Sequence, residues 1–83
     1  MNAKVQELKA PAATTTERGP WAVLEWRLQE GDPFAENEPI VDLIDPAGIL
    51  TIVAPASGRL SEVLVDTGSG VDAGETLGLL ILR

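Results

Sequence analysis

Cysteine and histidine are both absent from this chain of 83 residues. Their absence excludes disulfide bonds, thiolate nucleophiles and imidazole bases, together with nearly every zinc or copper site. Aromatic residues are also scarce, because Trp21, Trp26 and Phe34 are the only three. Leucine, valine and isoleucine must therefore supply most of the core, which in a chain of this length is small and belongs to one domain.

Positive charge is also in short supply. Against 13 aspartates and glutamates, which leave a net charge of −7, the chain has six scattered cations: Lys4, Lys9, Arg18, Arg27, Arg59 and Arg83. Such a distribution cannot neutralise a run of nucleic-acid phosphates. No apolar run approaches the roughly 20 residues that span a bilayer, and the opening "MNAKVQELKAP" has no apolar signal-peptide core. We expect neither nucleic acid nor membrane as a partner, and a cytoplasmic location.

The chain does contain a series of short apolar segments separated by turn-forming residues. These segments are "WAVLEWRL", "IVDLI", "ILTIV", "RLSEVLV" and "TLGLLIL". No 3.6-residue period runs through them, so the pattern predicts an all-β domain. In the first segment the apolar alternation slips by one residue at Leu24, which a β-bulge would absorb. The earlier "VQELK" (residues 5–9) fits a short edge strand or the tail of a linker, and residues 10–20 are predicted to form a loop.

A repeat lies inside this pattern. A shift of 37 residues places "VLEWRL" on "LSEVLV" and Gly31 on Gly68, and the same register places Phe34 on Val71 and Ile40 on Leu77. Two copies of strand, turn and strand predict two similar half-sheets in a pseudo-twofold sandwich or flattened barrel, in which each half covers the apolar face of the other.

The stretch "IDPAGI" lies between two of the apolar segments and has the composition of a hairpin tip. Asp45, Pro46 and Gly48 occupy the first, second and fourth positions that a type I β-turn favours. Asp can bond back to the turn backbone, and Pro presets its own φ near −65°. The sequence therefore predicts a stiff turn over residues 45–48.

A family resemblance is visible in "EWRLQEGDPFAENEPIVDLI" and "APASGRLSEVLVDTGSGVDAGETLGLLIL". They resemble the lipoyl and biotinyl carrier domains, most closely the lipoyl domains of the acyltransferase component of 2-oxo acid dehydrogenase complexes. "VQELKAP" looks like the family's first strand, so residues 1–83 would form one lipoyl-like domain, with residues 1–4 outside its ordered part. The shared elements are the Trp26 strand, Gly31-Asp32, Ala54-Pro55 with Gly58, and Gly68 with Val71 and Gly74.

The resemblance implies a fold and a site. The fold is a flattened β-barrel, or barrel-sandwich hybrid, of two four-stranded antiparallel sheets with pseudo-twofold symmetry. The site is a carrier lysine at the exposed tip of a hairpin, where its amine forms an amide with lipoate or biotin.

That lysine is missing here. Sixteen residues on from Gly31 and eight residues back from Pro55 both lead to Ala47, and a slip of one residue would put Pro46 at the attachment position instead. Neither side chain has a nucleophile. The hairpin of Asp45, Pro46, Ala47 and Gly48 is therefore interpreted as a degenerate attachment site without lipoate or biotin.

Other residues admit a functional and a plainer interpretation. The glycines at 31, 58, 68, 70 and 74 could cradle a phosphate, but without a strand-to-helix context and a P-loop lysine they are interpreted as turn residues. Asp32, Glu36 and Glu38, or Asp66 and Asp72, lack the even spacing of a calcium loop and are interpreted as a solvated acidic rim rather than a metal site. Trp26 is expected in the core, whereas Trp21 could instead be an exposed partner contact.

The leading functional hypothesis is a lipoyl-like module without lipoate that acts through protein contacts, with a component of a 2-oxo acid dehydrogenase complex as partner. The rival is a genuine carrier of lipoyl, biotinyl or acyl groups that uses an unusual residue such as Lys9. A domain of a larger transporter adaptor or carboxylase is a third reading, although no helical-hairpin heptads or enzyme segment support it. A catalytic role is not expected in so small a chain. The runs "LGLLIL" and "ILTIV" leave room for edge pairing between two copies.

Overall fold

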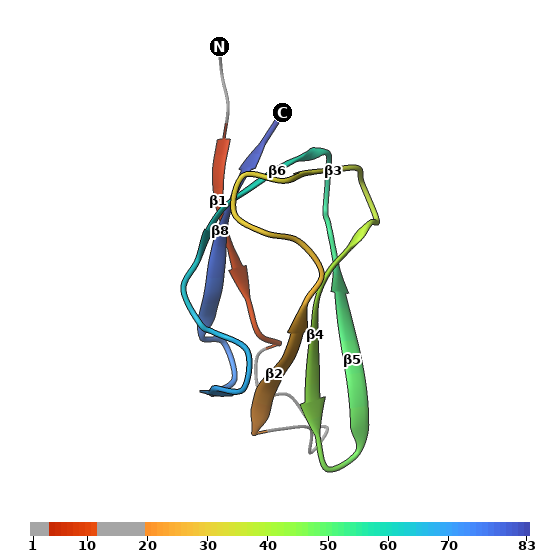
Figure 1. Ribbon diagram of the computed structural model, residues 1–83, viewed down its shortest axis with the longest axis vertical. Helices are drawn as coiled ribbons and strands as arrows, with labels where there is room; N and C mark the ends of the chain where they lie inside the picture. Colours follow the sequence, from red (N-terminus) through yellow and green to blue (C-terminus); the bar gives the residue numbers. More distant parts are fainter. Residues whose placement is uncertain (1–3, 12–19) are drawn as a thin grey trace.

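The structure of the chain, a computed structural model, describes residues 4–11 and 20–83, which form eight β-strands (Figure 1). They are β1 (Lys4–Lys9), β2 (Trp21–Trp26), β3 (Pro33–Phe34), β4 (Pro39–Asp45), β5 (Gly48–Val53), β6 (Gly58–Val63), β7 (Gly70–Val71) and β8 (Thr76–Leu82). The predicted all-β class is confirmed. The segment "VQELK" belongs to a strand, and residues 12–19 of the predicted loop lie outside the described residues.

The strands form two four-stranded antiparallel sheets, ordered β1-β8-β6-β3 and β5-β4-β2-β7. This confirms the architecture that the resemblance implied. The run "TLGLLIL" forms β8, which has β1 along one edge and β6 along the other. The expectation that this run could pair between two copies is therefore wrong, because both of its edges are already occupied. The run "ILTIV" lies in β5, at the end of its sheet.

The 37-residue repeat is visible in the bounds of the strands. The strands β2, β3 and β4 recur as β6, β7 and β8, each boundary shifted by 37 residues. Backbone hydrogen bonds recur with them: the N–H of Arg27 donates to Ile40 O at 2.7 Å, and that of Leu64 donates to Leu77 O at 2.9 Å. The half-sheets are interlocked rather than separate, because each copy sends its two-residue strand to the other sheet, β3 to β6 and β7 to β2.

Both copies have an irregular register at the same place. The pairing of β2 with β4 shifts between Val23 and Glu25, and the pairing of β6 with β8 shifts between Leu60 and Glu62. The bulge predicted at Leu24 is therefore confirmed. The additional residue allows Val23 and Trp26 to face the interior from one strand, where Val23 is 1% exposed and Trp26 packs against the core.

The core lies between the two sheets and is mainly aliphatic. Its fully buried large side chains are Val23, Ile40, Val41, Leu43, Leu60, Leu77 and Leu80. Trp26 is half-buried and its indole Nε1–H donates to Val65 O at 2.8 Å, which confirms a core position with a satisfied polar tip. The alternative of Trp21 as an exposed partner contact is wrong, because Trp21 is only 4% exposed and belongs to the core cluster.

Two of the glycines make equivalent tight turns. Gly31 and Gly68 have φ values of 94° and 90°, which side chains of L-residues rarely allow. The N–H of Gly31 donates to Leu60 O at 2.7 Å, and that of Gly68 donates to Val23 O at 2.8 Å. Each turn therefore ties one repeat to the bulged strand of the other, which agrees with the interpretation of these glycines as turn residues.

Candidate functional site

The β4–β5 hairpin forms one extremity of the molecule, and the start of β1 and the end of β8 lie at the other (Figure 1). Asp45 is paired with Gly48, and Pro46 and Ala47 between them are exposed. The structure thus brings the four residues predicted as a degenerate attachment hairpin together at one tip.

The geometry of this tip is held by Asp45. Its carboxylate Oδ1 accepts hydrogen bonds from the N–H groups of Ala47 at 2.9 Å and Gly48 at 3.1 Å, and the residue is 8% exposed. Gly48 has φ 133°, which favours glycine there. With the φ of Pro46 fixed by its ring, few torsions of the tip remain free. The tip is therefore a preorganised turn.

A lipoyl or biotinyl arm does not fit the residues at this tip. Both cofactors are attached in the resembling domains through a lysine amine, and neither the ring of Pro46 nor the methyl of Ala47 contains a nitrogen or oxygen. Neither of the two positions that the residue counts reach, Pro46 or Ala47, carries a reacting group. No chemistry of acyl transfer can start from these two side chains.

The chain's only lysines, Lys4 and Lys9, belong to β1 in the other sheet. Lys4 is paired with Leu82, at the extremity opposite the hairpin tip. Lys9 has a 56% exposed side chain whose Nζ lies 3.6 Å from Glu7 Oε1. The structure therefore brings no lysine to the hairpin, and the rival attachment residue Lys9 lies on a strand rather than on a turn.

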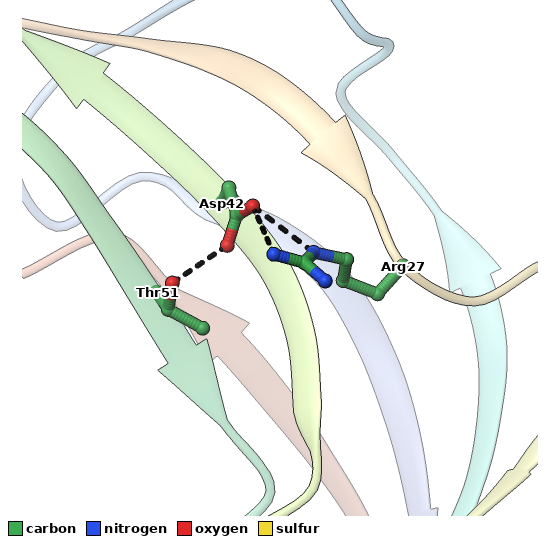
Figure 2. Close-up of polar contacts among 3 residues, drawn as sticks. All are labelled: Arg27, Asp42 and Thr51. Carbon is green, nitrogen blue, oxygen red and sulfur yellow. Dashed lines mark hydrogen bonds and ion pairs between the residues drawn. The ribbon is translucent and has the colours of Figure 1, made fainter.

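A polar cluster on the outward face of the hairpin sheet was not predicted from the sequence. Figure 2 shows Asp42 of β4 between Arg27, which follows β2, and Thr51 of β5. Arg27 donates from Nε and Nη2 to Asp42 Oδ2 at 3.0 and 2.8 Å, and the Thr51 hydroxyl donates to Asp42 Oδ1 at 2.7 Å. The cluster links β5 and β4 to the end of β2.

The electrostatics of this cluster favour the charged forms. Burial alone would raise the pKa of Asp42, but the hydrogen bonds from Thr51 and Arg27, with the charge of Arg27, together lower that pKa below its ordinary value of 3.8. The hydrogen bond to Asp42 and the charge of that carboxylate raise the pKa of Arg27.

The one sequence signal for the cluster is a lone acid within the apolar run "PIVDLI".

Two carboxylates of the acidic rim, and that of Glu75, accept hydrogen bonds from turn backbones. Asp32 accepts from the N–H of Gln29, Glu38 from that of Ala35, and Glu75 from that of Asp72, each at 2.9 Å. Over residues 4–11 and 20–83, no group of three or more acidic side chains is placed to hold a metal ion. In the same part of the chain, no helix has the length and apolarity needed to cross a membrane.

A shallow surface depression lies beside β3, away from the hairpin tip. Its volume is about 310 Å³, and it is lined by Pro33, Phe34, Ala35, Glu38, Ser57 and Arg83. The carboxylate of Glu38 is engaged with the N–H of Ala35. The depression is wide open to solvent and has none of the enclosure of an active-site cleft.

Comparison with known proteins agrees with this architecture. Residues 6–80 match the family described as "Biotin-requiring enzyme", the biotin/lipoyl family. The chain is 33% identical over 58 residues to the dihydrolipoyllysine-residue succinyltransferase component of the 2-oxoglutarate dehydrogenase complex of Azotobacter vinelandii, a match that covers 70% of this chain and 14% of that protein. The chain therefore spans only a small part of this curated relative.

Solved structures show the same likeness. The solution structure of the lipoyl domain of the Azotobacter vinelandii 2-oxoglutarate dehydrogenase complex is 29% identical with a TM-score of 0.70, over 87% of this chain and 92% of that domain. A single-chain, multi-domain long-chain acyl-CoA carboxylase, 24% identical with a TM-score of 0.80 over 95% of this chain and 7% of its own, shares the fold. The chain belongs to the biotin and lipoyl attachment domain family and is related to the lipoyl domains of 2-oxo acid dehydrogenase complexes.

Proposed function

We propose that this chain is a lipoyl-like module that bears no acyl group and acts through protein contacts with a component of a 2-oxo acid dehydrogenase or related acyl-transfer complex in the cytoplasm. The observation on which the proposal mainly rests is the hairpin tip, which has Pro46 and Ala47 where the family's attachment lysine is expected. The module would present the scaffold of a carrier domain without its reacting group.

The rigidity of the tip supports a docking role. Asp45 holds the N–H groups of Ala47 and Gly48, so the turn keeps one shape before any partner arrives. A preformed surface loses little conformational entropy on binding. A protein that receives lipoyl hairpins could therefore accommodate this tip, and the contact would occupy the receiving surface without any group being transferred.

The charge of the chain also suits docking. The net charge is −7, and the exposed carboxylates include Glu25, Glu36, Glu62, Asp66 and Asp72. A surface of one sign accelerates encounter with a surface of the opposite sign and disfavours partners of the same sign. We expect the partner to offer a basic surface to this acidic chain.

The first test is the intact mass of the protein isolated from its own cell. We expect the mass of the unmodified polypeptide, because no amine lies at the hairpin tip. A species heavier by one lipoyl, biotinyl or other acyl group would overturn the proposal. Peptide mapping of that species to Lys9 would establish the rival carrier hypothesis, since the side chain of Lys9 is half exposed.

The second test is retention of a purified 2-oxo acid dehydrogenase component on the immobilised chain. We expect a true lipoyl domain to displace the retained component. We also expect retention to fall as salt is raised to about 0.5 M, where exposed charges are screened beyond a few ångströms. Ala47→Arg should weaken retention, whereas Ala73→Arg, at an exposed turn position of β7–β8, should not. Retention that survives high salt, or that both variants change equally, would contradict docking through the tip.

A further inference from the structure

One long edge of the hairpin sheet carries no further strand among residues 4–11 and 20–83. Within this part of the chain, the strand β5 is the terminal strand of its sheet and is paired with β4. Figure 1 shows β5 at the margin of the molecule, with β4 on its inner side. A terminal strand presents a row of backbone N–H and C=O groups that can pair with another extended strand.

The equivalent edge in the other sheet is formed by a strand with charged residues, and β5 has none. The 37-residue shift places Asp45 of β4 on Leu82 of β8. Asp45 is paired with Gly48 of β5, and Leu82 is paired with Lys4 of β1. In the pseudo-twofold arrangement β1 therefore corresponds to β5. β1 contains Lys4, Glu7 and Lys9 among its six residues, and charged side chains oppose pairing at an edge. The six residues of β5, "GILTIV", include neither a charge nor a proline.

We propose that β5 pairs antiparallel with β5 of a second copy of this chain, across a twofold axis at Thr51, and joins two four-stranded sheets into one. Opposed residues in an antiparallel pair point to the same face, and β5 alternates strictly between exposed and half-buried residues. Centred on Thr51, the pairing opposes Ile49 to Val53 on the outward face and Leu50 to Ile52 on the inward face. Each is an apolar pair that stabilises a sheet.

The charges beside this edge do not oppose the pairing. Asp42 on β4 lies directly opposite Thr51, and Arg27 neutralises its carboxylate through two hydrogen bonds (Figure 2). The exposed apolar side chains of Ile44, Ile49 and Val53, which are 37%, 58% and 43% exposed, would lose contact with water. The remaining repulsion is the long-range one between two chains of net charge −7, which salt screens.

The size of the contact sets its strength. One six-residue strand from each copy buries less than the roughly 1,200 Å² of a standard interface. The dimer is therefore weak and reversible, and it strengthens with salt. Docking of the acidic surface on a basic partner weakens with salt, whereas self-association strengthens. The two proposals therefore predict opposite effects of salt, and the failure of one can be told from the failure of the other.

Sedimentation equilibrium of the full chain tests the edge. We expect a monomer–dimer equilibrium that is visible as the concentration approaches about 1 mM, the range of small transient contacts, and that tightens with added salt. Ile49→Lys should weaken association by about tenfold or more, because its contact occurs twice in each dimer. Val5→Lys is the matched control, since Val5 is the 66% exposed counterpart of Ile49 on β1, and it should leave the equilibrium unchanged.

A monomer at every concentration and salt, or an equal loss in both variants, would overturn the proposal. Circular dichroism and thermal melting of both variants confirm that each remains folded. Dimers that dissociate on binding an unrelated extended peptide would still support the open edge, whereas dimers unaffected by Ile49→Lys would place the contact elsewhere.

Disulfide trapping tests the register, because the chain has no cysteine of its own. In the proposed dimer Thr51 faces its own copy with Cβ atoms about 5 Å apart, whereas Val53 lies about 14 Å from its copy, four residues along the strand. Thr51→Cys should therefore form a covalent dimer faster than Val53→Cys under mild oxidation. Equal rates, or faster trapping of Val53→Cys, would reject the twofold axis at Thr51.

Discussion

At the scale of single residues, Asp42 is the most deeply buried charged residue within residues 4–11 and 20–83. It is 4% exposed, and a carboxylate removed from water is tolerated when charge and hydrogen bonds replace its hydration. Arg27 and Thr51 supply three such hydrogen bonds. The repeat offers a comparison, because the residues 37 positions after Arg27 and Asp42 are Leu64 and Leu79. One half of the molecule thus uses an ion pair where the other half places two leucines.

This comparison predicts how the pair responds to substitution. Arg27→Leu alone should lower the free energy of unfolding, because Asp42 would remain buried without its cation. The double variant Arg27→Leu with Asp42→Leu, which copies the other half, should recover most of that loss. Urea unfolding at neutral pH measures all three proteins.

The pH dependence provides the control for this prediction. The pKa of Asp42 is lower in the folded chain than its ordinary value of 3.8, so the unfolded chain binds the proton more readily. The contribution of Asp42 to stability is therefore complete above pH 3.8 and is lost as pH falls through the lowered folded pKa. The difference between the parent and Arg27→Leu should shrink over that acidic range. A constant difference would show that packing of the Arg27 side chain, rather than its charge, is responsible.

At the scale of elements, the proposal that the β4–β5 hairpin is a degenerate attachment site can be tested by introducing a lysine at its tip. Pro46→Asp with Ala47→Lys should accept lipoate from a lipoate ligase, Ala47→Lys alone should accept less because Pro46 retains its fixed φ and missing N–H, and the parent should accept none. Mass spectrometry measures the addition. Loss of one well-placed proline from the turn should cost only about 1 kcal/mol.

A true lipoyl domain modified in parallel serves as the positive control. If the double variant folds and stays unmodified while that control is modified, the surface around the hairpin has diverged from what the ligase recognises, or Ala47 does not correspond to the attachment position.

The elements differ in how far the sequence could predict them. The hairpin tip was predictable because Asp45, Pro46 and Gly48 encode it locally, and the bulge at Leu24 interrupts an apolar alternation. The two-residue strands β3 and β7 were not predictable from the sequence, because they exist only through pairing with β6 and β2 far along the chain. The Arg27–Asp42–Thr51 cluster was missed for the same reason, since pairing of β4 with β5 brings Thr51 to Asp42.

At the scale of the whole molecule, two interlocked repeats share one core and leave different edges. The copies agree in strand bounds, bulges and tight turns, which explains why a single offset in the sequence predicted so much of the architecture. They differ where function is expected: β1 is charged and β5 is not. The hairpin tip and the β5 edge are adjacent, so docking and self-association would meet on one end of the molecule.

The pairing of Lys4 with Leu82 also determines how the domain would respond to mechanical force. Both residues lie at the same end of the β1–β8 ladder, and the hydrogen bonds of an antiparallel ladder run perpendicular to its strands. A pulling force applied at Lys4 and Leu82 would break the hydrogen bonds of this ladder one residue pair at a time, instead of loading all of them together. The domain would yield by peeling β1 from β8, while the hairpin at the far end would stay unloaded and keep its shape.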